Sequence, residues 1–370
     1  MKKLSAFILS LSFFICLNAA AQSGSVQWGQ EVIINDAPGH YGSQYGRMLH
    51  LANGHWLAAF TIADNKGYRV DPSGGLRLEV AESRDHGQHW ERIAVLADKG
   101  RDLDNAALIQ LPDSSILLGG RSVRWQESYR LPVYRSTDQG KTWKRISMID
   151  ANEGAPGALG HPDKGVYEPH FCFLKDGRLA VMYANEKHVT DSVSYSQIIS
   201  ERISADFGHT WGKEIRVAYT PGDHASRPGM PVWTRMKNGR YIVVYEVCGP
   251  KDCNIYNKIS DDGITWPVGL GQPIAGQTGA PYILSLSDGR LLVTSNRENI
   301  SISDDNGVSW ELTKTEHPWP QKKSYAKDWT QTIWSALYQM GPDEIGMITS
   351  VKRDSGGHGV RLRFGKVKGD

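Results

Sequence analysis

The chain has 370 residues, of which 40% are hydrophobic, and its formal net charge is +2. This length suits one large β architecture better than one small domain, and the composition argues against a disordered or membrane-embedded chain. Lys2 and Lys3 lie in a segment that we expect to be removed, which leaves 40 basic and 40 acidic residues. Such a balance argues against nucleic acid or an anionic membrane as the main partner, because both require a basic surplus.

Residues 1–21 have the three parts of a secretory signal peptide. The basic segment Met1–Lys3 precedes the apolar segment Leu4–Leu17, and the small residues Ala19–Ala21 follow. The apolar segment is shorter than the roughly 20 residues that cross a bilayer as a helix. We therefore expect cleavage near Ala21 and export to the periplasm or the medium.

The expected mature chain, residues 22–370, is predicted to be a single soluble domain, because no later segment is long and apolar enough to span a bilayer. Lipid attachment at Cys16 is an alternative to a cleaved, unmodified leader. It is the weaker alternative, because bulky Ile15 stands where lipid attachment favours a small residue.

A motif of the form Ser-x-Asp-x-Gly-x-x-Trp recurs along the chain. Its copies are Ser83–Trp90, Ser136–Trp143, Ser204–Trp211 and Ser303–Trp310, with a shortened copy at Ser260–Trp266. The Ser and Asp side chains can bond nearby backbone N–H groups, glycine supplies a positive φ, and tryptophan can pack on the sheet. Each copy is therefore predicted to be a hairpin turn with a structural role and no chemistry of its own.

A second kind of turn alternates with the first. Its copies are Ala52–His55, Pro112–Ser115, Lys175–Arg178, Lys237–Arg240, Ser287–Arg290 and Gly341–Glu344. Apolar strand-like runs such as Tyr241–Tyr245 flank these turns, which recur at intervals of 50–62 residues. A unit of this length accommodates four antiparallel strands. The fold class is therefore predicted to be all-β, a six-bladed β-propeller of four-stranded antiparallel blades.

The order of strands predicts which face of the propeller carries the chemistry. If the second kind of turn joins strands one and two of each blade, and the first kind joins strands three and four, both lie on one face. The starts of first strands and the ends of second strands then lie on the opposite face. A candidate functional residue should therefore lie at one of these strand ends.

Two glutamates meet this condition. Glu168 lies nine residues before Gly177, at the start of a first strand, and Glu246 lies seven residues after Gly239, at the end of a second strand. They belong to neighbouring blades. Paired carboxylates across a pocket suit glycosidic cleavage, in which one protonates the leaving oxygen and the other attacks or stabilises the anomeric carbon. For either residue alone, a salt-bridged strand end is the alternative interpretation.

Other polar and aromatic side chains are expected on the same rim and could bind sugar hydroxyls or a sugar ring. They are Arg47, Asp104, Asn105, Arg121, Arg227, Tyr325 and Trp334. Ordinary ion pairing or packing is the alternative for each of them.

Cys248 and Cys253 bracket a short loop, and export would permit a disulfide between them. Cys172 lies in an apolar run and is predicted to be a buried free thiol. No Cys/His pairs have zinc spacing, and the Ser-x-Asp turns lack the twelve-residue pattern of a calcium loop. We therefore expect neither a metal nor an organic cofactor.

The chain resembles the family 93 glycoside hydrolases, secreted exo-acting arabinanases on a six-bladed propeller, along nearly the whole mature sequence. The matching segments are Leu103–Ala106, Gly165–Pro169, Arg227–Pro231, Tyr245–Gly249 with Cys253, Tyr256–Gly263, Gly279–Pro281 and Trp334–Tyr338. Two positions depart from the expected pattern. Ala106 stands where proline is expected, and Tyr167 stands where relatives have tryptophan.

The resemblance implies release of arabinobiose or a similar short unit from the non-reducing end of α-1,5-linked arabinan, with retention. It makes Glu246 the nucleophile and Glu168 the general acid/base. Retention implies carboxyl groups about 5–5.5 Å apart, against about 6.5–9.5 Å for inversion. The expected partner is thus a plant-type arabinan or another glycan, and a propeller that closes on itself is expected to be a monomer.

Two other functions remain open. A sialidase would clamp a carboxylate with three arginines and could recruit them from Arg47, Arg121, Arg227 and Arg297, but Tyr45–Met48 lacks the Arg-Ile-Pro signature. That scheme also leaves Glu168 without a role. A non-catalytic glycan-binding propeller would carry the same turns and aromatic residues, but it would not need the pair of glutamates.

Overall fold

The structure is a computed structural model that describes residues 26–38, 41–63, 67–68, 75–191, 196–249, 252–297, 299–319 and 332–367. The expected signal peptide and Tyr325 lie outside these residues. Almost all regular structure in the described residues is β-strand, with one short 3₁₀ helix, η1 (Lys187–Thr190). None of the described helical structure is long and apolar enough to cross a membrane.

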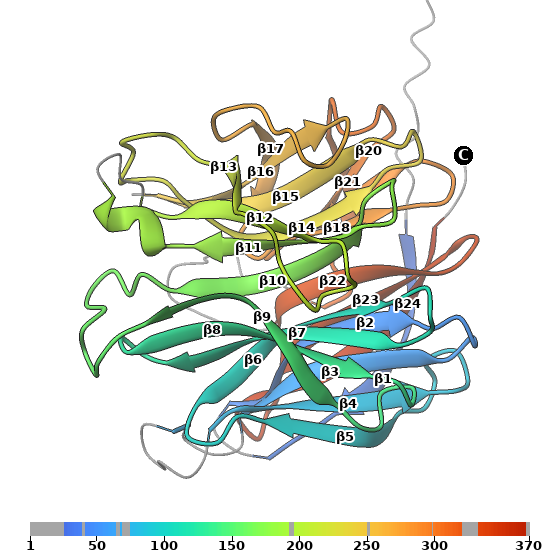
Figure 1. Ribbon diagram of the computed structural model, residues 1–370. Coiled ribbons are helices and arrows are strands. Elements are labelled where there is room, and N and C mark those ends of the chain that lie inside the picture. Colours follow the sequence, from blue (N-terminus) through green and yellow to red (C-terminus); the bar gives the residue numbers. More distant parts are fainter. Residues whose placement is uncertain are drawn as a thin grey trace, which may run out of the picture.

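Four sheets contain four antiparallel strands each, in chain order (Figure 1). The first two are β6 (Asp102–Gln110), β7 (Ile116–Arg124), β8 (Ser128–Ser136) and β9 (Lys144–Glu153), then β10 (Val166–Phe173), β11 (Leu179–Asn185), β12 (Ile198–Ser204) and β13 (Ile215–Ala218). The next two are β14 (Arg227–Arg235), β15 (Tyr241–Cys248), β16 (Cys253–Ser260) and β17 (Gln272–Thr278), then β18 (Tyr282–Ser285), β19 (Leu291–Thr294), β20 (Asn299–Ser303) and β21 (Glu311–Glu316).

A fifth sheet has eight strands and joins the two ends of the described chain. Its strands are β2 (Gly42–His50), β3 (Trp56–Ala63), β4 (Arg77–Ser83), β5 (Glu91–Ala97), β22 (Thr332–Gly341), β23 (Glu344–Lys352), β24 (His358–Val367) and β1 (Val26–Asn35). A single parallel pairing, Gly42 with His358, links β2 to β24. All other pairings are antiparallel, so this sheet consists of two four-stranded halves.

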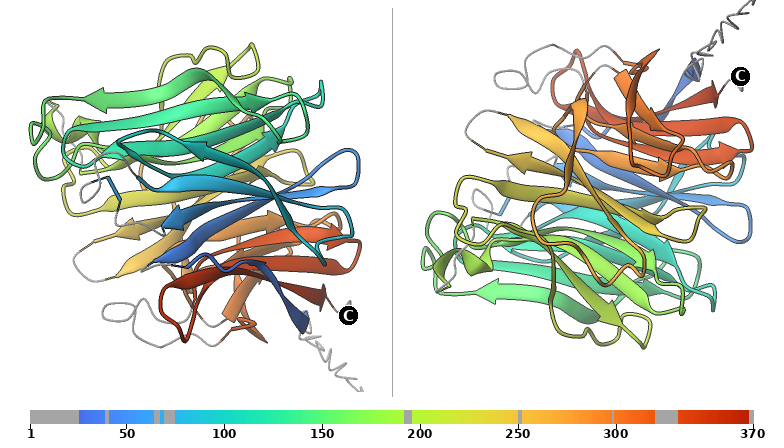
Figure 2. Two further views of the ribbon diagram at one scale, coloured as in Figure 1. Left: turned by 90° about the horizontal axis from the view of Figure 1, so that it is seen from below. Right: turned by 90° about the horizontal axis from the view of Figure 1, so that it is seen from above.

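Strand β1 supplies the outer strand of the half that contains β22, β23 and β24. It pairs with β24 from Val26–Val367 to Asn35–Val360, and Figure 2 shows it in dark blue beside the red C-terminal strands. This strand was not predicted from the sequence, because its exposed positions leave only a weak apolar pattern.

The first strands of successive units contact one another in order. The contacting pairs are β2 with β6, β6 with β10, β10 with β14, β14 with β18, β18 with β22, and β22 with β2. Tyr45, Met230 and Ala280 form one buried cluster with Trp334 packed against it, although they come from four of these units. The starts of the first strands therefore converge on a common centre.

Both kinds of predicted turn lie at the predicted junctions. The turn at Ser136–Trp143 joins β8 to β9, where Ser136 Oγ accepts the Gly140 N–H at 2.8 Å and Asp138 Oδ1 accepts the Thr142 N–H at 2.9 Å. Gly140 has φ 89°, and a Cβ there would lie 3.0 Å from the Leu57 side chain of the neighbouring unit. The turn thus requires glycine for its backbone and for its close contact between sheets.

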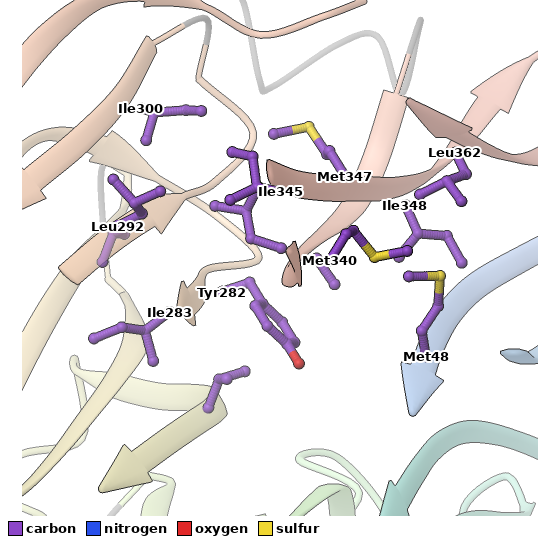
Figure 3. Packing of buried hydrophobic residues seen from close by; sticks show 14 of the residues in the cluster. Met48, Tyr282, Ile283, Leu292, Ile300, Met340, Ile345, Met347, Ile348 and Leu362 are labelled. Atoms are coloured by element: carbon purple, nitrogen blue, oxygen red, sulfur yellow. The ribbon is translucent and has the colours of Figure 1, made fainter. Parts of the chain in front are cut away.

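The hydrophobic core lies between neighbouring sheets. Inner strands such as β11 and β15 are almost wholly buried, which explains their continuous apolar sequences, whereas outer strands such as β5 and β9 alternate with exposed positions. Figure 3 shows one such region, where Met48, Tyr282 and Met347 come from β2, β18 and β23. Burying each large apolar side chain contributes about 1.5–3 kcal/mol, so these layers hold adjacent sheets together.

Candidate active site

A cavity of about 420 Å³ opens where β10 and β14 begin and where β7, β11 and β15 end. This is the face opposite the two sets of turns, as predicted. Its lining residues are Arg121, Trp125, His161, Pro162, Asp163, Tyr167, Glu168, Glu186, Gln197, Arg227, Gly229, Glu246 and Cys248. Both predicted glutamates therefore face one opening.

Glu168 lies in a bulge near the start of β10. The strand register shifts between Tyr167 and His170, and Glu168 itself has φ 57°, in the left-handed region. Its Oε2 accepts the backbone N–H of Met230, on the next first strand, at 2.8 Å. The bulge thus turns the carboxylate toward the neighbouring unit.

Glu246 lies near the end of β15, opposite Gly229 of β14. Its Oε2 accepts the backbone N–H of Ala280 at 2.7 Å. Ala280 precedes the next first strand, β18, and also has a positive φ, 48°. Each candidate carboxylate is therefore held by a backbone N–H from the unit that follows it.

This arrangement recurs around the fold. A residue with φ between 48° and 58° lies at or just before the same part of every first strand: Tyr45, Asn105, Glu168, Met230, Ala280 and Trp334. The Tyr45 N–H donates to Ser350 Oγ of β23 at 2.9 Å. Ser350 pairs with Ile333, and Glu246 pairs with Gly229. Ile333 and Gly229 each directly precede the positive-φ residue of their strand, so Ser350 and Glu246 occupy equivalent positions. Glu246 thus occupies a position that elsewhere has a structural role.

Desolvation raises the pKa of both glutamates. Burial and the negative charge of Glu168 raise the pKa of Glu246 to about 7, although the Ala280 N–H and Arg227 act in the opposite direction. Burial also raises the pKa of Glu168 above its ordinary value, opposed by Arg121 and the Met230 N–H. The negative charge of Glu168 therefore acts on the ionisation of Glu246.

Asp104 and Arg121 form a bidentate ion pair beside the cavity, with distances of 2.8 and 2.6 Å. Burial raises the pKa of Asp104, whereas that carboxylate holds the pKa of Arg121 above its ordinary value against the effect of burial. Arg121 lies 5.0 Å from the Trp125 ring centre and 5.6 Å from that of Tyr167. Arg121 lines the cavity and Asp104 supports it from behind.

Three other predicted rim residues lie at the centre of the molecule and do not line this cavity. The Arg47 guanidinium lies 3.9 Å from the Tyr45 ring centre, and its Nη1 donates to the Trp334 carbonyl at 3.0 Å. Asn105 is buried, and Trp334 packs edge-on against Tyr45 at 5.7 Å. The structure thus places Arg47, Asn105 and Trp334 around Tyr45, and the positive charge of Arg47 also acts against the raised pKa of Glu168.

Several lining residues were missed in the sequence. Trp125, Glu186 and Gln197 lie at strand ends, and His161 and Asp163 come from the segment between β9 and β10. Tyr129 donates its hydroxyl to Asp163 Oδ2 at 2.5 Å, which fixes that segment against β8. Position directly after a second strand could have indicated Trp125, which follows β7, and Glu186, which follows β11; nothing local marks the others.

Arg227, predicted on the rim, lines the cavity beside Glu246. Its Nη2 donates to Glu186 Oε1 at 2.5 Å and to Gln197 Oε1 at 3.1 Å. Half of the Arg227 side chain is exposed, whereas that of Glu186 is 1% exposed. Arg227 is therefore the accessible end of a buried ion pair.

Cys248 and Cys253 form a disulfide that joins the end of β15 to the start of β16. Glu246 and these two cysteines are the one group of potential metal ligands among the described residues. Their sulfur atoms are bonded to each other and are not thiolates, so this donor set does not suit a metal ion. Cys172 is a free thiol whose pKa burial raises to about 12.

The BNR repeat-like domain family matches residues 14–197, just under half of the chain. No curated protein sequence matches this chain. Among solved structures, the GH93 alpha-L-arabinofuranosidase of Fusarium graminearum, in complex with arabinobiose, has a TM-score of 0.74 at 22% identity, with 92% of this chain and 98% of that chain covered. The chain shares the fold of that enzyme.

Two further structures are similar. The alpha-L-arabinanase of Penicillium chrysogenum, complexed with arabinobiose, has a TM-score of 0.72 at 24% identity over 91% of this chain and 98% of that chain. The NanB sialidase of Streptococcus pneumoniae has a TM-score of 0.63 at 10% identity over 92% and 70%. The predicted resemblance to family 93 is thus confirmed at the level of the fold, and the BNR match fits the wider sialidase-like propeller group.

Proposed function

We propose that this chain is a glycoside hydrolase that uses Glu168 and Glu246 to cleave an arabinan-type glycan. The observation that carries the proposal is the placement of two coupled carboxylates in the wall of one cavity, each held by a backbone N–H. A glycan-binding propeller would have no need for a desolvated pair of acids, whose burial is costly.

The proposal includes a closed six-bladed propeller as the scaffold. The antiparallel four-stranded sheets and the succession of first-strand contacts from β2 around to β22 and back support this architecture. A closed ring would direct the starts of all first strands to one central opening, where Glu168 and Glu246 lie in neighbouring blades.

The proposed reaction is a retaining double displacement. By resemblance to family 93, the Glu246 carboxylate attacks the anomeric carbon while Glu168 protonates the leaving oxygen. Glu168 then deprotonates water, which cleaves the glycosyl ester and releases the sugar with its original configuration. Burial and the negative charge of Glu168 raise the pKa of Glu246 to about 7, so loss of the Glu246 proton is part of forming the attacking carboxylate.

Azide rescue distinguishes the two roles. A nucleophile variant, Glu246→Ala, should react with azide and an activated aryl arabinoside to give a glycosyl azide of inverted configuration. The acid/base variant, Glu168→Ala, should give the azide of retained configuration. The reverse pattern of products would exchange the two roles and leave the proposed pair intact.

The proposed substrate is α-1,5-linked arabinan or an arabino-oligosaccharide, cleaved from its non-reducing end. Trp125 and Tyr167 offer aromatic surfaces in the cavity, and Arg227 and Gln197 offer hydrogen bonds to hydroxyl groups. Two structurally similar enzymes were solved in complex with arabinobiose, which supports the same class of ligand here. We further propose that residues 1–21 direct export to the periplasm or medium.

A sialidase is the second candidate, because a sialidase shares the fold. Of the four arginines available to it, only Arg121 and Arg227 line the cavity, and each is already paired with a carboxylate. A carboxylate-binding clamp of three arginines is therefore less well supported than a neutral-sugar site.

Chromatography of the products from debranched arabinan, other arabinose polymers and a sialyl substrate tests the proposal. We expect a short arabinose product from arabinan alone, and a loss of roughly 10³-fold or more in turnover for Glu246→Gln. The amide retains an acceptor for the Ala280 N–H, so the variant should stay folded. Unchanged sugar release by Glu246→Gln would contradict the proposed role of Glu246, and release of sialic acid would favour the second candidate.

A further inference from the structure

Glu186 is a third buried carboxylate in the cavity wall, and the proposed reaction gives it no role. It directly follows β11, and its side chain is 1% exposed. Oε1 accepts from Arg227 at 2.5 Å, and Oε2 accepts from the Tyr167 hydroxyl at 3.1 Å. Both carboxylate oxygens are thus engaged, each by a residue next to one of the two catalytic candidates.

The two partners of Glu186 belong to the strands that begin at the cavity. Tyr167 directly precedes Glu168 on β10, and its ring also packs edge-on against Tyr129 at 5.5 Å. Arg227 opens β14, and its charge lowers the pKa of Glu246. One buried anion therefore connects the surroundings of both carboxylates.

The chain around Glu186 is itself firmly held. Its backbone N–H donates to the Gly165 carbonyl, just before β10, at 2.9 Å. In the helix η1 that follows, Lys187 pairs with Asp150 at 2.6 Å and His188 with Glu214 at 2.9 Å. These bonds fix the backbone position of Glu186. The carboxylate of Glu186 therefore sets where its partners, Tyr167 and Arg227, lie.

We propose that Glu186 is a positioning residue that holds Tyr167 beside Glu168 and Arg227 beside Glu246. The inference rests on the proposed function for its catalytic consequence. By pairing with Arg227, Glu186 also limits how much of the arginine's positive charge acts on Glu246. The cavity thus contains a buried carboxylate that sets both the geometry and the charge of the reacting pair.

The substitution Glu186→Gln keeps the shape of the side chain and removes its charge. Arg227 then loses its ionic partner, and its uncompensated charge should stabilise ionised Glu246. Loss of the negative charge of Glu186 also favours the ionised form of Glu246. Glu246 should therefore lose its proton at lower pH. A misplacement of about 1 Å in the pair is expected to lower kcat by roughly 10²-fold, with a smaller change in KM.

Three further variants separate charge from geometry. Glu186→Asp keeps the charge on a shorter side chain, so kcat should fall while Glu246 titrates near its original pH. Tyr167→Phe removes the hydrogen bond from the Tyr167 hydroxyl to Glu186 without changing charge. This variant should also lower kcat and leave the titration of Glu246 near its original pH. Glu201→Gln is a control for replacing a buried glutamate of the same sheet, because Glu201 does not line the cavity.

The experiment combines steady-state kinetics with a ¹³C NMR titration of δ-labelled glutamate carboxyl groups, in which Glu246→Gln assigns the Glu246 signal. We expect Glu186→Gln to lower kcat and to move the Glu246 titration to lower pH. Glu201→Gln should change neither. An unmoved Glu246 titration in folded Glu186→Gln, or an unchanged kcat, would overturn the inference.

The two readouts keep the inference separate from the proposed function. A wild-type protein that releases no sugar from any tested glycan would contradict the proposed function, and the titration would still decide whether Glu186 controls Glu246. If Glu186→Gln does not fold, Tyr167→Phe and Glu186→Asp decide instead. An unchanged kcat in both of these variants would then refute the positioning role.

Discussion

Glu168 and Glu246 lie on different strands but share one local arrangement. Each accepts a backbone N–H from a residue with positive φ, Met230 or Ala280. A neutral N–H stabilises a carboxylate less than a bound arginine would, so burial still raises the pKa of both groups. Burial therefore raises the pH at which Glu246 becomes the carboxylate that the proposed attack requires.

Glu201, which lies outside the cavity, offers a separate test of how burial changes the pKa of a carboxyl group. Glu201 on β12 is fully buried, and its Oε2 accepts the Trp266 indole N–H at 2.9 Å. Burial raises its pKa to about 8, against an ordinary value of 4.5. Because the unfolded chain loses this proton first, stability should fall as pH rises from about 4.5 to about 8.

We therefore predict that Glu201→Gln removes this part of the pH dependence and stabilises the protein at pH 7 by about 3 kcal/mol or less. Urea unfolding at pH 5, 7 and 8 measures the effect. At pH 5 the two proteins should be nearly equal in stability. A gain of the same size at every pH would show that the carboxyl group does not titrate as expected.

Among the elements, positive-φ residues at the starts of three first strands, Tyr45, Met230 and Ala280, each donate a backbone N–H to a side chain of the preceding unit. The Tyr45 N–H bonds to Ser350 Oγ in one unit, and the Ala280 N–H bonds to Glu246 Oε2 in another. A buried N–H without an acceptor is costly, so this position on the second strand favours an acceptor side chain. Glu246 satisfies that structural need with the group proposed for catalysis.

We predict that Ser350→Ala lowers the free energy of unfolding by about 1–3 kcal/mol, because the Tyr45 N–H loses its acceptor. Ser128→Ala is the matched control. Ser128 is also buried in a strand, but its hydroxyl has no hydrogen-bond partner among the described residues. Denaturant midpoints should therefore fall for the first variant only. Equal losses would contradict the proposed role of the bulge.

At the scale of the whole molecule, strand β1 connects the start of the described chain to its last strand. Ile34 of β1 is buried in the largest core cluster, whereas its neighbour Ile33 is 56% exposed. Arg361 of β24 further binds Glu31 at 3.2 Å and Asp36 at 2.7 Å. The outer edge of the last unit thus depends on residues from the other end of the chain.

We predict that Ile34→Ala lowers the free energy of unfolding by about 2–5 kcal/mol, the usual cost of truncating a buried isoleucine. Ile33→Ala, on the same strand but pointing outward, should change it by at most about 0.5 kcal/mol. Equilibrium urea unfolding monitored by tryptophan fluorescence measures both. Equal effects would mean that the pairing of β1 with β24 does not contribute to global stability.

The sequence allowed most strands, both kinds of turn and the face that holds the cavity to be predicted, because glycine turns and apolar runs are local signals. It also located Arg121 and Arg227 in the cavity wall. Arg47, Asn105 and Trp334 were expected on the same face and lie at the centre outside the cavity lining, since a residue's distance from a turn does not reveal its direction in a bulge. Pairing of β1 with β24 is long-range and left no local signal.

If Glu168 and Glu246 act together on one sugar, a covalent intermediate should form and can be trapped. Glu168→Gln removes the proposed base, so an activated dinitrophenyl arabinoside should still glycosylate the enzyme while hydrolysis of the ester becomes slow. Mass spectrometry of the intact protein and its peptides should then find the sugar on Glu246. A sugar bound to any other residue, or turnover without a covalent intermediate, would refute the joint role of Glu168 and Glu246.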